Sequence, residues 1–290
     1  MSATLRDAVA EGERIGSAYT IIPPRTTLAG AGGARVSRRA GGSLEFRDHR
    51  DYQPGDDLRH LDWNVLARSD RLTVKQFQEE VSPHLDLIVD GSRSTGLEGT
   101  RKGEATMAIA ALLAAAARNS GHPYTLSVAR EQLTTVARGS TRPTDWDGID
   151  FDFAGSPAAA IVDGARSLRP LSLRVFISDL LWRGEPRAVL AALAQGAAAV
   201  LVVQVMAQSE VAPDLRGGWR LIDAESGEWR EIVFDAAAAA RYSDALTRHR
   251  ALWDEAARQV RALVVRGVAE EMEGQLVFDE LGDAGILRAS

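Results

Sequence analysis

The stretch LDLIVDGSRSTG, residues 85–96, begins as an apolar run and ends in small polar residues. A short apolar run such as LDLIVD is typical of a strand that is buried on both faces. Directly after the apolar run come Asp90, Ser92 and Ser94, at alternate positions. The stretch therefore predicts a central strand of a parallel sheet that delivers three oxygen-bearing side chains to one point.

Strands and helices are expected to alternate after this stretch. The apolar runs LRVFISD and AVLVVQVM predict two further buried strands, and YTLSVAR and QLTTVAR predict a strand pair. Apolar periodicity predicts helices over 105–119, 156–168, 186–197 and, as a long amphipathic helix, 236–265. The pattern predicts an α/β fold, a doubly wound, mainly parallel sheet flanked by helices, with an additional β-hairpin around Glu225-Ser226-Gly227.

The N-terminal part of the chain differs from the rest in amino-acid composition. Residues 1–80 are expected to form an N-terminal extension: a short helix, an irregular Gly- and Arg-rich arm and a charged segment, packed on the main domain. The main α/β domain is expected over 81–270, and a C-terminal tail over 271–290.

Charge and composition argue against several classes of protein. The formal net charge of -6 and the sequence pI of about 5.5 give no general support for binding nucleic acid or an anionic membrane. There is no cysteine, so thiolate metal sites and disulfides are excluded. The first residues lack an apolar signal core, and the apolar runs are far shorter than the roughly 20 residues that span a bilayer. We expect a cytoplasmic protein without membrane insertion.

Asp90 and Asp179 each end a predicted buried strand. Two carboxylates at neighbouring strand ends would repel each other and raise one pKa, and a bound cation would remove that cost. Together with Ser92 and Ser94 they form a set of oxygen donors without His or Cys, which favours Mg²⁺ or Mn²⁺ over zinc. The alternative interpretation is that Asp90 and Ser92 only shape a turn and cap a helix.

The pattern Asp-x-Ser-x-Ser after a buried strand resembles the metal-ion-dependent adhesion site of von Willebrand factor A-like domains. That resemblance implies a later hydroxyl ligand and an aspartate from a further strand end. Ser156 stands where the family commonly has threonine, with Thr141 or Thr144 as the other candidates, and Asp179 fits the last position. Such a site has few anionic ligands, so it can accept a carboxylate from a partner protein.

The charged segment GSLEFRDHRDYQPGDDLRHLDWNVLARSDRLTVKQFQEE, residues 42–80, resembles the bacterial family called domain of unknown function 58. The resemblance covers roughly residues 35–270. It implies a von Willebrand factor A-like fold and an adaptor or chaperone-like role beside a MoxR-type AAA+ ATPase or a client shared with it. Many members carry N-terminal membrane helices, and this sequence shows none.

The charged segment mixes acidic and basic residues almost evenly. It is expected to be either a lattice of ion pairs that holds the N-terminal extension on the main domain, or a partner-binding surface. The residues singled out for these roles are Arg47, Arg50, Asp56, Asp57, Arg59, Asp62, Trp63 and Arg68.

The sequence favours a non-enzymatic, metal-dependent interaction module over three other functions. A metal-dependent phosphohydrolase could use Asp90 as its phosphoryl acceptor, but Ser92 stands where such phosphatases usually have an acid/base aspartate. A serine hydrolase lacks the Gly-x-Ser-x-Gly turn at Ser92. A nucleic-acid module has only the short basic stretch ARVSRRAGG in its favour.

Overall fold

The computed structural model of the chain describes residues 1–22, 44–53, 61–69, 71–79, 84–182, 184–272, 276, 279–283 and 285–290. The chain forms two compact units: unit 1 comprises Met1–Thr27 and Pro83–Ser290, and unit 2 comprises Leu28–Ser82. The sequence analysis grouped residues 1–80 together, whereas the structure assigns the first helix to unit 1, because that helix packs on a helix that covers the sheet.

Unit 1 is built on a mainly parallel sheet. Its strands lie in the order β11-β8-β7-β4-β5-β6, and β6 alone pairs in the antiparallel sense. Every residue of β4 and β7 is buried, as the two apolar runs predicted. The strands are β4 (Leu85–Asp90), β5 (Tyr124–Ala129), β6 (Leu133–Gly139), β7 (Leu173–Ser178), β8 (Ala199–Met206) and β11 (Leu263–Val268).

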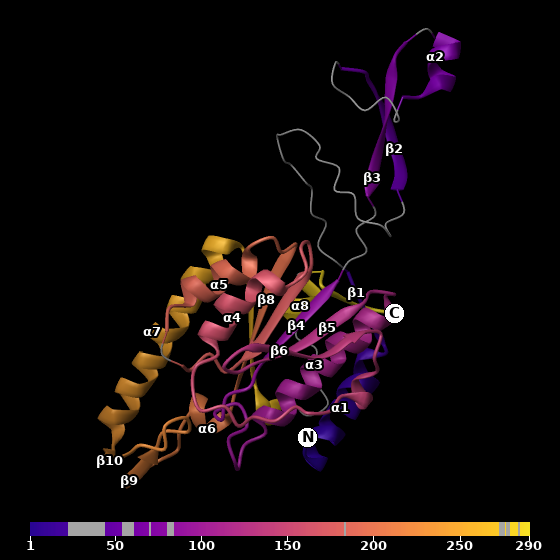
Figure 1. Cartoon of the computed structure of the whole chain (residues 1–290). Helices are drawn as coiled ribbons and strands as arrows, with labels where there is room; N and C mark the ends of the chain where they lie inside the picture. The colour runs from indigo at the N-terminus through magenta and orange to yellow at the C-terminus, as the bar shows by residue number, and fades with distance from the viewer. Residues whose placement is uncertain are drawn as a thin grey trace. The chain divides into compact units, whose positions relative to one another are not determined.

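Helices cover both faces of this sheet (Figure 1). Leu87 and Val89 of β4 face a core that includes α3, and Ile88 between them faces the core under α4, α5 and α7. The helices are α1 (Ala3–Gly16), α3 (Lys102–Asn119), α4 (Ala158–Gly164), α5 (Pro186–Ala194), α6 (Gln208–Val211), α7 (Ala236–Val260) and α8 (Asp279–Asp283). These layers confirm the predicted α/β class, compatible with a Rossmann-like fold.

The long helix α7 is shorter than the sequence pattern predicted. It ends at Val260, since Arg261 takes a left-handed conformation with φ of 57°. The edge strand β11 follows at once, parallel to β8. The expected helix over 236–265 was therefore wrong at its C-terminal end, where the chain turns back into the sheet.

Helix α1 forms a further layer on α3. A Cβ atom on Gly12 would lie 2.1 Å from the carbonyl oxygen of Ala108, so only glycine allows the two helices to approach this closely. After α1, strand β1 (Tyr19–Ile21) pairs antiparallel with β12 (Leu287–Ala289). The residues expected to form a C-terminal tail thus contribute a strand to unit 1.

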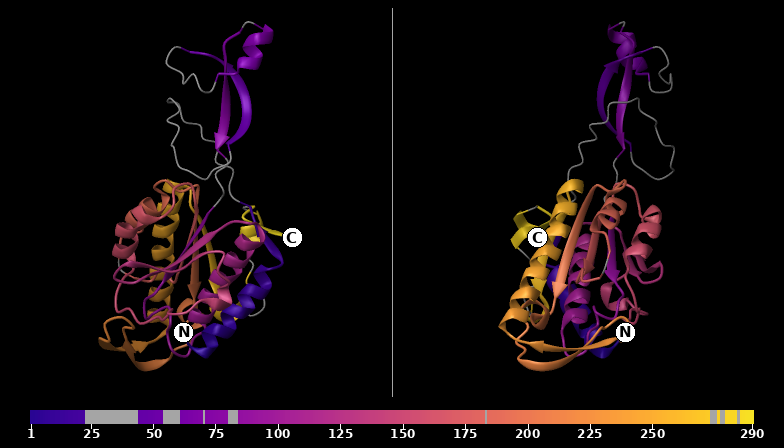
Figure 2. Two further views of the ribbon diagram at one scale, coloured as in Figure 1. Left: turned by 45° about the vertical axis from the view of Figure 1, so that its right-hand side comes forward. Right: turned by 90° about the vertical axis from the view of Figure 1, so that its left-hand side faces the viewer.

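The additional hairpin consists of β9 (Gly217–Ile222) and β10 (Trp229–Phe234), paired antiparallel as predicted. In both views of Figure 2 it lies at the end of unit 1 where α1 begins. Its strands are largely exposed. Among the residues that the structure describes, no helix is both long and apolar enough to cross a bilayer.

Unit 2 contains an antiparallel strand pair and a short helix. Strands β2 (Leu44–Asp51) and β3 (Thr73–Glu79) pair with an irregularity between Phe46 and Asp48. Asp62 precedes helix α2 (Trp63–Ser69), and its amide donates to the carbonyl of Thr73.

Candidate functional site

Asp90 ends β4 and has no exposed surface. Its Oδ1 accepts a hydrogen bond from the amide of Ser92 (2.9 Å), and its Oδ2 accepts one from the hydroxyl of Ser178 (2.6 Å). Burial and the nearby charge of Asp179 raise the pKa of Asp90 to about 7, against the lowering effect of these hydrogen bonds. The ionised form of Asp90 is therefore disfavoured at this site, first by burial and then by the carboxylate of Asp179.

Three hydroxyl groups follow Asp90 in a tight turn. The Ser92 hydroxyl lies 3.1 Å from the Ser94 hydroxyl and 3.4 Å from the Thr95 hydroxyl. Ser92 and Thr95 are almost fully buried, and Ser94 is half-buried. The structure thus brings together the three residues that the opening stretch singled out, and it adds Thr95.

Asp179 follows β7 and belongs to a buried ionic cluster that consists of Lys102, Asp179 and Glu210. We call this cluster the switch-point triad. The switch point is the place where an α/β sheet grows in opposite directions, here between β4 and β7. The Lys102 ammonium donates to Asp179 Oδ2 and to Glu210 Oε1, both at 2.7 Å. Burial alone would lower the pKa of Lys102, but the two carboxylates outweigh it and raise that pKa. Lys102 is therefore a charged, fully buried cation that neutralises one of the two carboxylates it contacts.

The loop before α4 is held against the Asp-x-Ser-x-Ser turn. Phe153 forms a parallel bridge with Ser92, and its carbonyl accepts from the amide of Arg93 at 3.0 Å. The hydroxyl of Ser156 in this loop accepts a local hydrogen bond from the amide of Ala158 (3.2 Å). The loop is thus adjacent to the site, while the Ser156 hydroxyl is engaged within its own loop.

Thr141 and Thr144 do not belong to the site. The carbonyl of Thr141 accepts from the hydroxyl of Tyr124, which begins β5, and the amide of Thr144 donates to Glu13 of α1. Asp90 instead pairs with Ala129, at the other end of β5. The structure therefore does not bring the two threonines together with Asp90, because they lie toward the amino ends of the parallel strands.

Glu225, in the turn of the β9–β10 hairpin, joins the two loops of the site. Its Oε1 accepts from the amide of Ser94 (2.9 Å), and its Oε2 accepts from the amide of Gly155 (3.1 Å). The guanidinium of Arg93 donates to its main-chain carbonyl at 3.5 Å. A carboxylate from a distant segment is thus held by backbone donors at the rim of the site.

Several of these residues were missed by sequence reasoning. Glu210 lies in α6, the short helix that follows β8, so a search beyond the carboxyl end of the third buried strand could have found it. Lys102 is a basic residue at the start of a highly apolar helix, which is a weaker signal. Glu225 lies 131 residues from Ser94, and no local sequence pattern predicts that it contacts the site.

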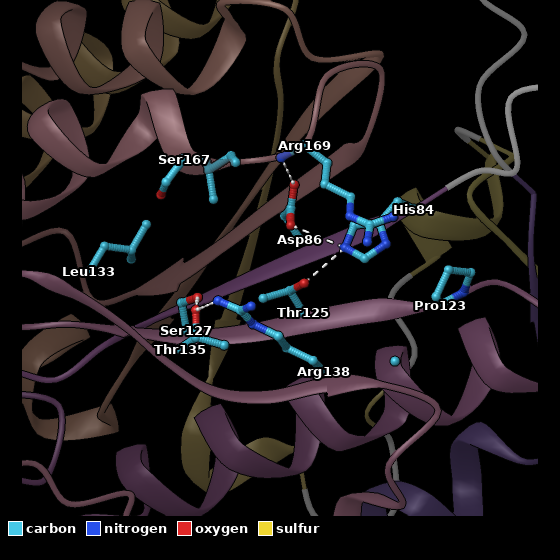
Figure 3. A pocket seen from close by; sticks show the side chains of 12 residues that line it. His84, Asp86, Pro123, Thr125, Ser127, Leu133, Thr135, Arg138, Ser167 and Arg169 are labelled. Carbon is cyan, nitrogen blue, oxygen red and sulfur yellow. Dashed lines mark hydrogen bonds and ion pairs between the residues drawn. The ribbon is translucent and has the colours of Figure 1, made fainter. Parts of the chain in front are cut away.

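A cavity of about 190 Å³ lies at the opposite end of the sheet (Figure 3). His84 and Asp86 line it, with the His84 Nε2 placed 2.9 Å from the hydroxyl of Thr125 and 3.3 Å from Asp86 Oδ1. None of the predicted metal-site residues lines this cavity.

The charged block of unit 2 is described in part. Asp62 is 6% exposed, and its carboxylate accepts from the amide of Val65, which caps α2. Trp63 is 64% exposed, and Arg68 is also exposed. The side chains of Arg47 and Arg50 and all of Asp56, Asp57 and Arg59 lie outside the described residues.

The residues at the strand ends fit a hard divalent ion in part. Asp90, Ser92 and Ser94 supply clustered oxygen atoms next to a surplus of negative charge, which is the donor chemistry that Mg²⁺ and Mn²⁺ prefer. Asp179 and Ser156 fit less well, because their side chains are engaged by Lys102 and by the amide of Ala158. In the part of the chain that the structure describes, no group of three His, Cys, Asp or Glu residues could hold a metal ion.

Comparison with known proteins places the chain in a family. The family described as "Protein of unknown function DUF58" matches residues 48–252. Uncharacterized protein Rv1480 of Mycobacterium tuberculosis and Uncharacterized protein Mb1516 of Mycobacterium bovis are each 31% identical over 242 residues, which is 76% of this chain and 72% of each relative.

Solved structures resemble the chain only distantly. A conserved hypothetical protein BatB from Bacteroides thetaiotaomicron is 14% identical, with a TM-score of 0.38 over 69% of this chain and 99% of its own. An aerotolerance-related membrane protein from Bacteroides fragilis is 16% identical, with the same TM-score over 67% and 98% of the two chains. The sequence relationships, in contrast, extend over most of the α/β unit, and the chain belongs to the DUF58 family of proteins of unknown function.

Proposed function

We propose that the chain is a non-enzymatic protein-interaction module whose contact surface is formed by the loops beyond the carboxyl ends of β4 and β7. The observation that carries the proposal is the carboxylate of Glu225, which is bound at the rim of those loops by the amides of Ser94 and Gly155. A rim that holds one acidic side chain is suited to recognise an acidic side chain of another protein.

Within this proposal, Mg²⁺ or Mn²⁺ binds to Asp90, Ser92 and Ser94. The ion would supply a positive centre that attracts a partner's carboxylate. The raised pKa of Asp90 supports the proposal, since burial and the nearby charge of Asp179 both disfavour the ionised carboxylate, and a bound cation would favour it. Asp179 would act mainly through its charge, because its Oδ2 is held by Lys102.

The proposal includes the finer fold assignment and the partner that the family resemblance implies. The fold is proposed to be von Willebrand factor A-like, since the Asp-x-Ser-x-Ser turn follows a central strand of the sheet. The partner is proposed to be a MoxR-type AAA+ ATPase or a protein client that it shares with this chain.

Titration calorimetry with magnesium or manganese chloride tests the metal. We expect saturable heat at millimolar concentration, and we expect Asp90→Ala to abolish it. Asp163→Ala, at an exposed carboxylate on α4, is the matched control and should leave binding unchanged. A folded wild-type protein that takes up neither ion would contradict the metal-binding part of the proposal.

A pull-down against the MoxR-type ATPase encoded nearest the gene, with magnesium and with chelator, tests the partnership. Stronger binding with magnesium supports the full proposal, and equal binding in both conditions removes the ion from the interface. Absence of binding in both conditions would contradict a stable complex.

A metal-dependent phosphohydrolase that uses Asp90 is less well supported. Asp90 has no exposed surface, and both of its carboxylate oxygens accept hydrogen bonds within the protein. Hydrolysis of p-nitrophenyl phosphate that Asp90→Ala removes would nevertheless replace the interaction proposal with the enzymatic one.

A further inference from the structure

The contact of Glu225 with the two site loops has the geometry of ligand recognition. Each carboxylate oxygen accepts one backbone hydrogen bond, at 2.9 Å from the amide of Ser94 and at 3.1 Å from the amide of Gly155. Hydrogen bonds from N–H groups to a carboxylate are stronger than those between neutral groups. We call the pair of amides, with the guanidinium of Arg93 beside them, the carboxylate receptor.

The receptor is assembled from two separate loops. Ser94 lies in the turn after β4, and Gly155 lies in the loop before α4. The two loops are joined by the bridge between Ser92 and Phe153 and by the donation of the Arg93 side chain to the carbonyl of Asp152 (3.2 Å). This packing holds the two amides at the spacing of the two oxygens of one carboxylate.

The hairpin turn presents Glu225 in a fixed orientation. The Oδ1 of Asp223 accepts from the amides of Glu225 (3.0 Å) and Ser226 (2.8 Å), and Gly227 has a φ of 72°, which favours glycine. The flanking strands are largely exposed. The acidic turn is therefore rigid, while the arm that carries it buries little surface of its own.

We propose that the carboxylate receptor is the part of the interaction surface that recognises an acidic side chain of a partner, and that Glu225 fills it in the free protein. The partner's carboxylate and the hairpin turn then compete for the same two amides. The inference rests on the proposed interaction function for the identity of the occupant, but the receptor itself can be tested without any partner.

Amide NMR of the full chain in chelator, with acetate as the probe, tests the receptor. In Glu225→Ala the amides of Ser94 and Gly155 are left without their acceptor. Their hydrogen exchange should become faster by on the order of tenfold, since their protection depends on the docked turn. Acetate should then shift both amide signals saturably, at roughly tens of millimolar because so small a ligand binds weakly.

Two controls make the result specific. Glu228→Ala removes another exposed carboxylate of the same hairpin and should leave the exchange and the acetate response as in the wild type. Sodium chloride at equal ionic strength should not reproduce the acetate shifts. In the wild-type protein Glu225 fills the receptor, so acetate should shift these two signals much less.

The proposal is overturned if Glu225→Ala leaves the exchange of both amides unchanged, or if acetate does not shift them in that variant. It is also overturned if the shifts appear only when magnesium replaces the chelator, because the ion and not the amides would then bind the carboxylate. A failed metal titration or ATPase pull-down would contradict the proposed function without altering these measurements.

Discussion

Strand β4 carries two aspartates on one face, and they lie in different electrostatic surroundings. Asp86, at the amino end, accepts from the amide of Arg169 (3.1 Å) and from the hydroxyl of Ser172 (2.7 Å). Asp90, at the carboxyl end, also accepts two hydrogen bonds, but its pKa is raised to about 7 by burial and by the charge of Asp179.

The comparison shows which property distinguishes the candidate site. Both aspartates are buried and hydrogen-bonded, so neither burial nor donors separate them. They differ in their charged neighbours: Asp86 lies near His84 and Arg174, whereas Asp90 lies near a second carboxylate, Asp179, which the parallel topology brings to the end of the neighbouring strand β7. Unbalanced charge of this kind is more typical of functional sites than of structural ones.

The largest effect is expected from breaking the switch-point triad. Lys102→Met would leave Asp179 and Glu210 buried without their cation, which should lower the free energy of unfolding by about 3–5 kcal/mol. Urea unfolding followed by circular dichroism measures this. Arg14→Met, which removes an exposed ion pair with Glu11, should leave the stability nearly unchanged. Equal stabilities of the two variants would show that the charge of Lys102 does not stabilise the buried carboxylates of Asp179 and Glu210.

An intermediate effect on the free energy of unfolding is expected when each of the two aspartates of β4 is replaced by asparagine. Asp86→Asn loses hydrogen bonds to a charged group and should cost about 1.5–3 kcal/mol at neutral pH. Asp90→Asn should cost less, because it also removes the repulsion by Asp179. Urea unfolding in chelator measures both. A larger loss for Asp90→Asn would contradict the comparison.

The raised pKa of Asp90 predicts the direction in which the stability of the protein changes with pH. The folded-state pKa of Asp90 is raised from 3.8 to about 7, so the contribution of Asp90 to the free energy of unfolding should fall as the pH rises through this interval. Asp90→Asn should lack that slope and gain stability relative to the wild type between about pH 4 and 7. Parallel pH profiles of the two proteins in chelator would be inconsistent with a raised pKa.

The smallest effect concerns a carboxylate outside the sheet, Glu13 of α1. Burial alone would raise its pKa, but hydrogen bonds from Thr144 and Arg142 outweigh it and lower it. Its stabilising contribution is therefore present above the unfolded-state pKa and is lost as the pH falls through the folded-state pKa. Glu13→Gln should cost about 1–2 kcal/mol at pH 7 and almost nothing in acid, as measured by urea unfolding at both pH values. A cost that is independent of pH would indicate a loss of packing.

Much of the sheet could be predicted from the sequence. The apolar runs that became β4, β7 and β8 are short and bounded by polar residues, which few structures other than buried strands explain. The edge strand β11 was missed because Leu263 continues the helical spacing of α7, and only the left-handed Arg261 interrupts it. The end of the helix depends on that one backbone conformation.

The site was predictable where its residues are close in sequence. Asp90, Ser92 and Ser94 share one turn, so their convergence follows from the strand that precedes them. Lys102 and Glu225 come from a helix and a hairpin whose packing no local pattern specifies. The hydroxyl expected from Ser156, Thr141 or Thr144 was an open choice for the same reason, since it depends on how a remote loop folds back.

The pairing of β1 with β12 sets an order for folding during synthesis. Tyr19 pairs with Ala289, so this contact cannot form until residue 289 has been synthesised and has left the ribosome. Unit 2, Leu28–Ser82, is complete much earlier, and its strand pair closes a far shorter loop. Unit 2 can therefore fold while the sheet of unit 1 is still being made, and α1 can pack on α3 only after α3 has been synthesised.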